Sequence, residues 1–290
     1  MQIDNLILGH NSFFGINHID YDKGKNTNLK FQNLNKIIDI IEFSVSNGIK
    51  NFMISTLEQA PSFINMLSDK NIKDLNFYIL LPYINKYVRK SNELGLLGLI
   101  KDIAKNKSFY ENLSQGSEIG TFLLKGNYEK LIPTLIDIEL NSFKNVNKKT
   151  IILHDALTDI LIALKRIDVI DFFLDTVKKK FNCIPGLATK NFPRLYEYEK
   201  KLTNDSFFVL THGNKLGFNM NPNKALVEEC FNKTKLNLIM MSVFASGYLN
   251  AKDASQYVNS FKNDKIEVVA GCSTKEHIMD YINYFCEKKR

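Results

Sequence analysis

Thr150-Ile-Ile-Leu-His-Asp-Ala-Leu-Thr-Asp159 is the stretch that decides the fold. Its apolar, β-branched run at residues 151–153 predicts a buried strand, and the apolar spacing over residues 157–164 predicts a helix directly after it. His154 and Asp155 stand at the junction, where the apolar run ends. In a barrel of alternating parallel strands and helices, the active site lies at this end of the strands. The stretch therefore predicts a strand–helix unit with polar chemistry at its junction.

The same alternation extends outward in both directions along the chain. Strands are expected at residues 6–9, 51–56, 77–81, 151–153, 183–188, 207–211, 236–241 and 266–270, with helices between them, one of which continues to about Phe181. About eight such units in series are typical of a closed parallel barrel. No G-x-G-x-x-G follows any of these strands, which opposes a dinucleotide-binding open sheet.

Residues 88–148 are longer than one crossover requires, and they contain helix-like patterns around 94–104 and 128–140. Neither pattern has enough apolar residues for a core of its own. We therefore predict a single (β/α)8 barrel domain over residues 1–290, with an extra helical insertion around residues 88–148.

Composition places the chain among ordinary globular proteins. It has 290 residues, of which 44% are hydrophobic and 24% charged, so there is enough apolar material for a large core. The net charge of +7 comes from lysines spread along the chain. Without a basic stripe, this charge favours a small molecule, including an anionic one, as the partner and opposes nucleic acid.

Cysteine spacing and the N-terminus indicate the compartment. The four cysteines lie far apart and include no C-x-x-C pair, as is typical of reduced, buried thiols. No basic segment leads into an apolar one at the N-terminus, and no window reaches the length of a membrane span. These features predict a cytoplasmic protein with no membrane association, and they leave the oligomeric state open.

Several segments, taken in order, resemble the aldo-keto reductase superfamily. Leu8-Gly9 with Phe14-Gly15 looks like the first strand and loop of that family, and the strand ending in His154 looks like the strand that carries its catalytic histidine. Further segments are similar to its G-V-S-N-F motif, its S-P-L-x-x-G-x-L motif and its closing strand–helix turn: residues 186–192, 242–249 and 271–277. The resemblance covers most of the chain and implies an aldo-keto-reductase-like barrel.

The departures from that family concern its chemistry. The family uses an Asp and a Tyr after the second strand, a Lys after the third and a His after the fourth. Here the second strand is followed by Leu57-Glu58-Gln59, and Pro82-Tyr83 stands where the Lys is expected. Only His154 keeps its register. A carbonyl oxygen reduced at this site would therefore lack its usual tyrosine donor. The arginine that would hold a cofactor 2′-phosphate in the last helix is also missing.

Four residues are our catalytic candidates: His154, Asp155, Tyr83 and Lys190. A histidine near neutral pH is well matched to proton transfer, and Asp155 would be its charged partner. The structural alternative is that Asp155 only caps the following helix and that His154 bonds to backbone. Tyr83 follows the third strand and would supply an acid. Lys190 follows the fifth strand, where a lysine binds an anion or forms a Schiff base with a carbonyl.

Eight further residues are candidates for substrate binding because they lie in the expected strand-end loops: Asn11, His18, Lys86, Asn191, Asn219, Asn221, Ser273 and Thr274. Lys86 has an outer-surface alternative, and the two asparagines at 219 and 221 have the alternative of forming turns. Ser273 and Thr274 begin the last helix, whose N–H groups suit an anion; an ordinary N-cap is their alternative. His10, His18 and Asp155 raise the question of a metal, but no ligand-spaced motif is present and we predict none.

These features lead to a small-molecule metabolic enzyme acting on a polar carbonyl, sugar or phosphorylated substrate by acid–base chemistry around His154. Because most of the reductase residues are absent, an isomerase- or lyase-type reaction is expected in preference to reduction, and it requires no cofactor. The first alternative is an NAD(P)H-dependent oxidoreductase of the aldo-keto type, which would need NADPH. The second alternative is a non-catalytic barrel that binds a ligand.

Overall fold

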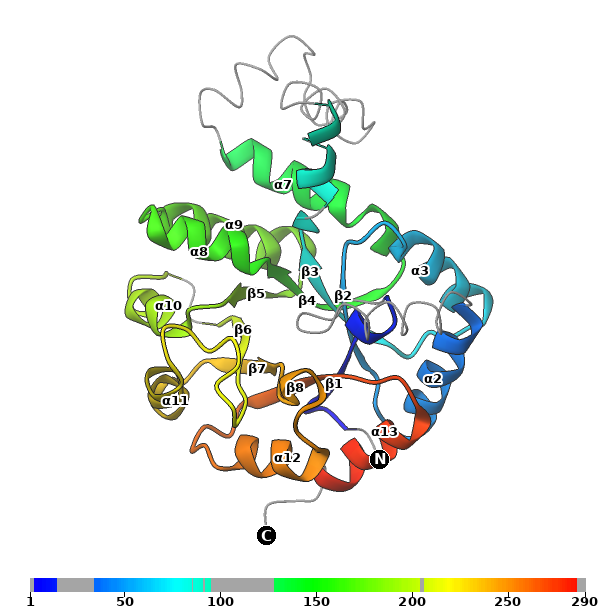
Figure 1. Ribbon diagram of the computed structural model, residues 1–290. Helices are drawn as coiled ribbons and strands as arrows, with labels where there is room; N and C mark the ends of the chain where they lie inside the picture. The colour runs from blue at the N-terminus through cyan, green and yellow to red at the C-terminus, as the bar shows by residue number, and fades with distance from the viewer. Residues whose placement is uncertain are drawn as a thin grey trace.

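The computed structural model describes residues 3–14, 34–84, 86–90, 92–94, 128–203 and 206–285. Its strands form one closed barrel in which every neighbouring pair is parallel and β8 pairs with β1 (Figure 1). The strands are β1 (Leu6–Gly9), β2 (Asn51–Ser55), β3 (Asn76–Leu81), β4 (Asn147–Leu153), β5 (Ile184–Thr189), β6 (Phe208–His212), β7 (Asn237–Met241) and β8 (Ile266–Gly271). The predicted (β/α)8 barrel is confirmed.

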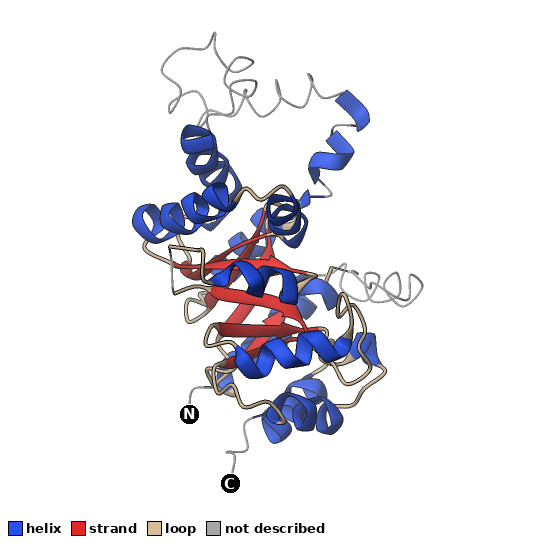
Figure 2. Ribbon diagram, turned by 90° about the vertical axis from the view of Figure 1, so that its left-hand side faces the viewer, coloured by secondary structure: helices blue, strands red, loops and turns tan. Residues whose placement is uncertain are grey.

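Helices surround the strands on all sides, as Figures 1 and 2 show. The α-helices described are α2 (Leu34–Ser46), α3 (Ala60–Asp69), α7 (Tyr128–Glu139), α8 (Asp155–Ala163), α9 (Ile167–Phe181), α10 (Phe192–Glu199), α11 (Lys224–Lys233), α12 (Ala251–Asn259) and α13 (Lys275–Phe285). Three short 3-10 turns accompany them: η1 (His10–Ser12), η2 (Asn141–Phe143) and η3 (Ala245–Gly247). Helix α7 matches the second helix-like pattern of the predicted insertion, whereas most of the first pattern lies outside the described residues.

Alternation along the strands divides the core into two layers. One layer fills the barrel interior and consists of Ile7, Met53, Tyr78, Ile152, Ala188, Phe208, Leu210 and Ile239. The residues between them, such as Ile151, Leu187 and Val209, belong to the larger core shared by the barrel and its helices. Because side chains alternate along a strand, the residue two positions after each inner residue also faces inward. The same rule decides which side chains face the interior at the C-terminal ends of the strands.

The floor of the barrel, at the N-terminal ends of the strands, holds a buried polar group. The Tyr78 hydroxyl donates to Glu267 Oε2 at 2.6 Å, and Lys149 Nζ lies 3.7 Å from Glu267 Oε1. Lys149 is the extra residue at a register shift, since Phe77 pairs with Lys148 and Tyr78 with Thr150. Burial raises the pKa of Glu267, which the bonds from Tyr78 and Lys149 only partly offset. The floor of the barrel is therefore closed by a hydrogen-bonded polar group made of Tyr78, Lys149 and Glu267.

One sequence expectation about helices is wrong in detail. The helix expected to run to Phe181 is broken into α8 and α9 because Lys165 adopts a left-handed φ of 57°. Helix α11 begins after Asn223, which caps it by accepting from the Leu226 N–H at 3.0 Å. In both places the local backbone sets the helix boundary, which hydrophobic periodicity does not report.

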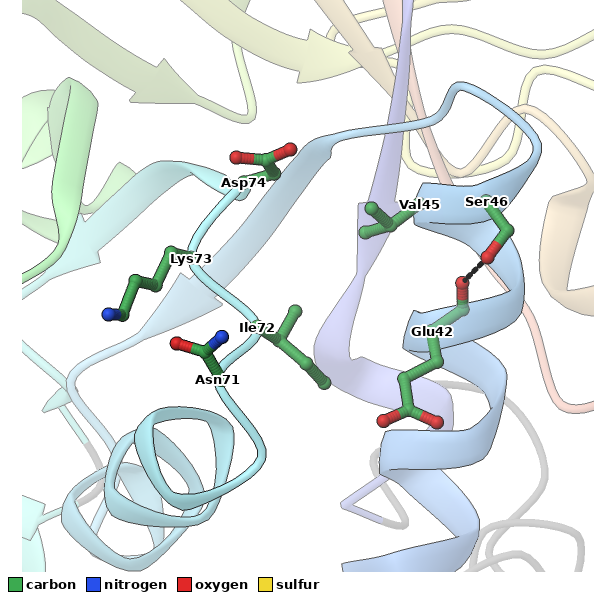
Figure 3. Close-up of a pocket in the computed structure, with 7 residues that line it drawn as sticks. All are labelled: Glu42, Val45, Ser46, Asn71, Ile72, Lys73 and Asp74. Carbon is green, nitrogen blue, oxygen red and sulfur yellow. Dashed lines mark hydrogen bonds between the residues drawn. The ribbon is translucent and has the colours of Figure 1, made fainter.

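A surface groove of about 620 Å³ lies between the end of α2 and the loop that leads into β3. In Figure 3, Ile72 extends from that loop toward Val45 and Glu42 of α2. The groove is at the N-terminal ends of the strands, opposite the end where catalytic residues lie in this fold. In the described part of the chain, no helix combines the length and apolarity needed to cross a membrane.

Candidate active site

The C-terminal ends of the strands form the mouth of the barrel, and the alternation of inner and outer residues places its side chains. His154 lies two residues after Ile152, Lys190 two after Ala188 and His212 two after Leu210, so all three continue the inner face. On the opposite side of the mouth, Gly9 pairs with Gly271 in register, and neither has a side chain. Among the described residues, the ionisable side chains that this rule places at the mouth therefore include those that follow β4 and β5 and the last residue of β6.

His154 and Asp155 contact each other directly. His154 Nδ1 lies 2.6 Å from Asp155 Oδ1, and Lys190 Nζ lies 3.6 Å from Asp155 Oδ2. Burial alone would raise the pKa of Asp155, but the hydrogen bond and charge of His154, the charge of Lys190 and the Ala156 N–H lower it to about 2. Asp155 is therefore a carboxylate at neutral pH.

This carboxylate assigns the proton on the His154 ring. Nδ1 lies 3.2 Å from the Ala156 nitrogen as well, but the same N–H lies 2.9 Å from Asp155 Oδ1. A ring nitrogen that donates to a carboxylate carries a proton and accepts nothing, so we assign Nδ1 as the donor to Asp155 and Asp155 as the acceptor from Ala156. Nε2 is then the ring atom that takes up or releases a proton.

Backbone bonds fix this pair at the end of β4. The His154 N–H donates to the Leu81 carbonyl at 2.8 Å, which ties the end of β4 to the end of β3. The His154 carbonyl accepts from the N–H groups of Leu157 and Thr158, which begins α8. The dyad therefore lies on two rigid elements and not on a mobile loop, as a catalytic geometry requires.

Asp159 is a site residue that the sequence analysis missed. Its carboxylate accepts from Thr189 Oγ1 at 2.5 Å and from the Lys190 N–H at 3.0 Å. Burial raises the pKa of Asp159, while the bonds from Thr189 and Lys190 lower it. The signal was present in the sequence, since Asp159 lies one helical turn after Asp155 and shares its face of α8.

Tyr83 is not brought together with His154. It follows the outer residue Leu81 by two positions, and its ring packs against the core between barrel and helices. Its N–H donates to Thr56 Oγ1 at 3.1 Å.

Lys86, expected at the mouth, instead forms an ion pair with a residue that the sequence did not single out. Lys86 Nζ lies 2.7 Å from Glu139 Oε1, and the Glu139 side chain is 1% exposed. The hydroxyls of Tyr87 and Thr56 also donate to this carboxylate. Burial, and then the charge of Glu139, raise the pKa of Tyr87. We call Thr56, Lys86, Tyr87 and Glu139 the Glu139 cluster.

The remaining candidates have mainly structural contacts. Asn191 caps α10 by accepting from the Arg194 N–H at 3.2 Å, and Thr274 accepts from the His277 N–H at 3.3 Å at the start of α13. The capping alternative therefore holds for Thr274. Ser273, next to it, is half-buried and directs its N–H toward His277 Nδ1 at 3.4 Å.

Asn11, Asn219 and Asn221 all lie in loops. Asn11 follows β1 within η1, Asn219 has a left-handed φ of 58° in the loop after β6, and Asn221 is exposed. The left-handed φ of Asn219 agrees with the turn-forming alternative. His18 lies outside the described residues.

The described residues include no group of three or more His, Cys, Asp or Glu side chains arranged to hold a metal ion. His10 is buried, and His212 Nδ1 lies 3.0 Å from Ser242 Oγ.

Solved structures share this architecture. An aldo-keto reductase enzyme from a Medee basin deep-sea metagenome library matches with a TM-score of 0.56 at 10% identity, covering 98% of this chain and 86% of the other. An aldo-keto reductase from Brucella melitensis matches with a TM-score of 0.54 at 10% identity over 98% and 89% of the two chains. The chain has the aldo-keto reductase fold.

An aldo-keto reductase complexed with NADPH also matches, with a TM-score of 0.55 at 8% identity over 99% of this chain and 80% of the other. No protein-family model and no curated protein sequence matches the chain. At this level of identity, the comparisons identify the fold, while the chemistry has to be argued from the mouth of the barrel.

Proposed function

We propose that this protein is an enzyme of the aldo-keto reductase type that interconverts a small, polar carbonyl compound and its alcohol, with His154 as the proton donor and acceptor. The observation that carries the proposal is the His154–Asp155 dyad at the mouth of the barrel, 2.6 Å between Nδ1 and Oδ1. The fold of the structural neighbours supports this reaction over the isomerase- or lyase-type reaction that the sequence led us to expect.

The residues around β8 and β1 fit a nicotinamide dinucleotide. At Gly271 an added Cβ would come within 2.6 Å of Ser12 Oγ, so the Ser12 hydroxyl packs directly against the Gly271 backbone and supplies a polar group there. The N-terminus of α13 follows directly, and helix N-termini bind phosphate through their N–H groups and partial positive charge. Glu276 in the first turn opposes an anion, so we expect this contact to be weaker than in a helix without it. When bound, such a cofactor supplies the hydride.

His154 then provides the proton. In the reducing direction, the imidazolium would donate its Nε2 proton to the carbonyl oxygen, and the neutral ring would keep its Nδ1 proton, hydrogen-bonded to the Asp155 carboxylate. In the oxidising direction, Nε2 accepts the alcohol proton. Asp155 holds the ring orientation in both directions and stabilises the imidazolium. Lys190 lies on the same face and is placed to contact a polar or anionic group of the substrate.

A cofactor-free isomerase or lyase reaction is the second candidate because the segment after β2 supplies no tyrosine acid: Leu57 is 3% exposed, and the Glu58 carboxylate pairs with Arg89. A single histidine is enough to move a proton next to a carbonyl.

The test is a titration of the purified protein with NADPH and with NADH, followed by their fluorescence, together with NADPH consumption over a panel of aldehydes, ketones and sugars. The proposal predicts saturable binding and substrate-dependent oxidation of NADPH. No binding up to about 1 mM, the upper range of ordinary KM values, would contradict it. Proton exchange into a sugar substrate without nucleotide would then favour the second candidate.

A further inference from the structure

The turn after β5 is held from a neighbouring helix. Asp159 of α8 accepts from the Thr189 hydroxyl and from the Lys190 N–H, and Thr189 Oγ1 in turn accepts from the Asn191 N–H at 2.9 Å. The Asp159 carboxylate therefore holds the Thr189 side chain and the Lys190 backbone directly, and the Asn191 backbone through Thr189. Lys190 is the middle residue of this turn.

The Lys190 side chain depends on that backbone for its position. Its side chain is 59% exposed, and its Nζ lies 3.6 Å from Asp155 Oδ2, a distance longer than a well-formed hydrogen bond. An exposed lysine gains little from one such pair, because it loses the freedom of a long side chain. Its ammonium therefore stays near Asp155 mainly because the turn places it there.

Helix α8 turns polar as well as apolar residues toward the interior. Asp155, Thr158 and Ile162 are buried, whereas Ile160 is 54% exposed. Asp155 and Asp159 lie one turn apart on this helix, and two carboxylates at that spacing repel each other. Carboxylates held in such an arrangement are expected where side chains serve a site.

We propose that Asp159 is a positioning residue, which fixes the turn Thr189–Asn191 and so holds Lys190 against the His154–Asp155 dyad. The proposal rests on the proposed function in one respect, the assignment of that dyad as the reacting pair. Asp159 acts through Lys190 and Asp155, because its two carboxylate oxygens accept from Thr189 Oγ1 and the Lys190 N–H, which hold the turn.

The experiment compares Asp159→Ala, Asp159→Asn and Asp171→Ala with the wild type. Asp171 of α9 is the matched control, because its carboxylate also accepts a hydrogen bond from a backbone N–H, that of Thr203, at 2.9 Å. The accessibility of Lys190 is measured as the rate of its acylation by an amine-reactive ester, quantified by mass spectrometry. The ring resonances of His154 are followed by NMR in ¹³C-histidine-labelled protein, and folding is monitored by thermal denaturation.

We expect Asp159→Ala to speed acylation of Lys190 roughly fivefold, the factor that one net hydrogen bond corresponds to, and to shift the His154 ring resonances. Asp159→Asn, which keeps an acceptor for the Lys190 N–H, should stay near the wild-type rate, and Asp171→Ala should leave both signals unchanged. If Asp159→Ala lowered only the denaturation midpoint, with Lys190 reacting as in Asp171→Ala, the role would be merely structural and the proposal would be wrong.

A second variant covers the case in which Asp159→Ala does not fold. Thr189→Val keeps the side-chain shape but removes the hydroxyl, so it should also speed Lys190 acylation; an unchanged rate would contradict the proposal. Neither measurement uses nucleotide. Failure of NADPH to bind would therefore remove the proposed function and leave the positioning role of Asp159 standing.

Discussion

His154 and Asp155 are neighbours in the chain, and their side chains still meet because a helix begins at their junction. His154 keeps the extended backbone of β4, with φ −60° and ψ 142°, while Asp155 is the first helical residue. The change of backbone direction brings both side chains to the inner edge of the barrel. The ionised carboxylate keeps the Nδ1 proton on the ring and leaves Nε2 for chemistry.

Replacing Asp155 by Asn tests this electrostatic pairing. The Asp155 carboxyl has a pKa of 3.8 in the unfolded chain and a pKa of about 2 in the folded protein. A lowered pKa means that the stabilisation is complete above the unfolded value and is lost as the pH falls toward the folded value. D155N should therefore lose roughly 2 kcal/mol of unfolding free energy at pH 7, and this deficit should shrink between about pH 4 and pH 2. Urea denaturation across this range measures it; a deficit independent of pH would contradict the pairing.

Residue order alone indicated part of the site. His154, Asp155 and Lys190 could be expected together because each directly follows a strand, and strand ends converge in a barrel. Tyr83 could not be placed because inner and outer positions differ by one residue, and the continuous apolar run at 77–81 does not show which of its residues face the barrel interior. The partner of Lys86 and Tyr87 could not be found at all, since Glu139 lies 52 residues beyond Tyr87.

At the scale of elements, the hydrophobic periods identified the strands and most helices, because each helix buries one face against the barrel. The break at Lys165, which separates α8 from α9, is an exception in length. Helix α7 raises a separate question of attachment. It belongs to the long segment before β4, and its last residue, Glu139, joins it to the ends of β2 and β3 through the Glu139 cluster.

The Glu139 cluster should be a major attachment of α7. Glu139→Ala leaves the half-buried Lys86 without its carboxylate, and breaking one side of a buried ion pair typically costs about 3 kcal/mol or more. We expect a loss of that order in chemical denaturation.

The control for this prediction is Asp74→Ala, which removes the exposed partner of Lys50 at 3.1 Å. An exposed pair contributes less than about 1 kcal/mol, so Asp74→Ala should change stability little. If both variants lost equally little, the Glu139 cluster would not attach α7 to the barrel.

For the whole molecule, the two ends of the barrel have different tasks. The mouth carries the dyad, whereas the floor is closed by Tyr78, Lys149 and Glu267, far along the strands from His154. In this fold, residues at the N-terminal ends of the strands generally contribute to stability, and residues at the C-terminal ends carry the chemistry. The closed order β1 to β8 followed from the sequence alternation alone, but the floor did not, because it depends on the register shift beside Lys149.

Glu267→Gln tests the floor. Because burial raises the pKa of Glu267, the folded protein favours the protonated carboxyl more than the unfolded chain does. The stabilising contribution is therefore complete below the ordinary value and is lost as the pH rises through the raised one. E267Q keeps an acceptor for Tyr78 without the charge, so its stability relative to wild type should increase from about pH 4 to pH 7. A relative stability that fell over this range would contradict the assignment.

The most direct test of the central claim is the turnover of His154→Ala beside the wild type, with NADPH and any carbonyl substrate found in the panel. General acid–base catalysis typically contributes about 10²- to 10⁴-fold. We predict a fall in kcat of at least about 100-fold, with the NADPH dissociation constant and the thermal midpoint near those of the wild type. Turnover within a few-fold of the wild type in a folded His154→Ala protein would contradict the role of His154 as the proton donor and acceptor.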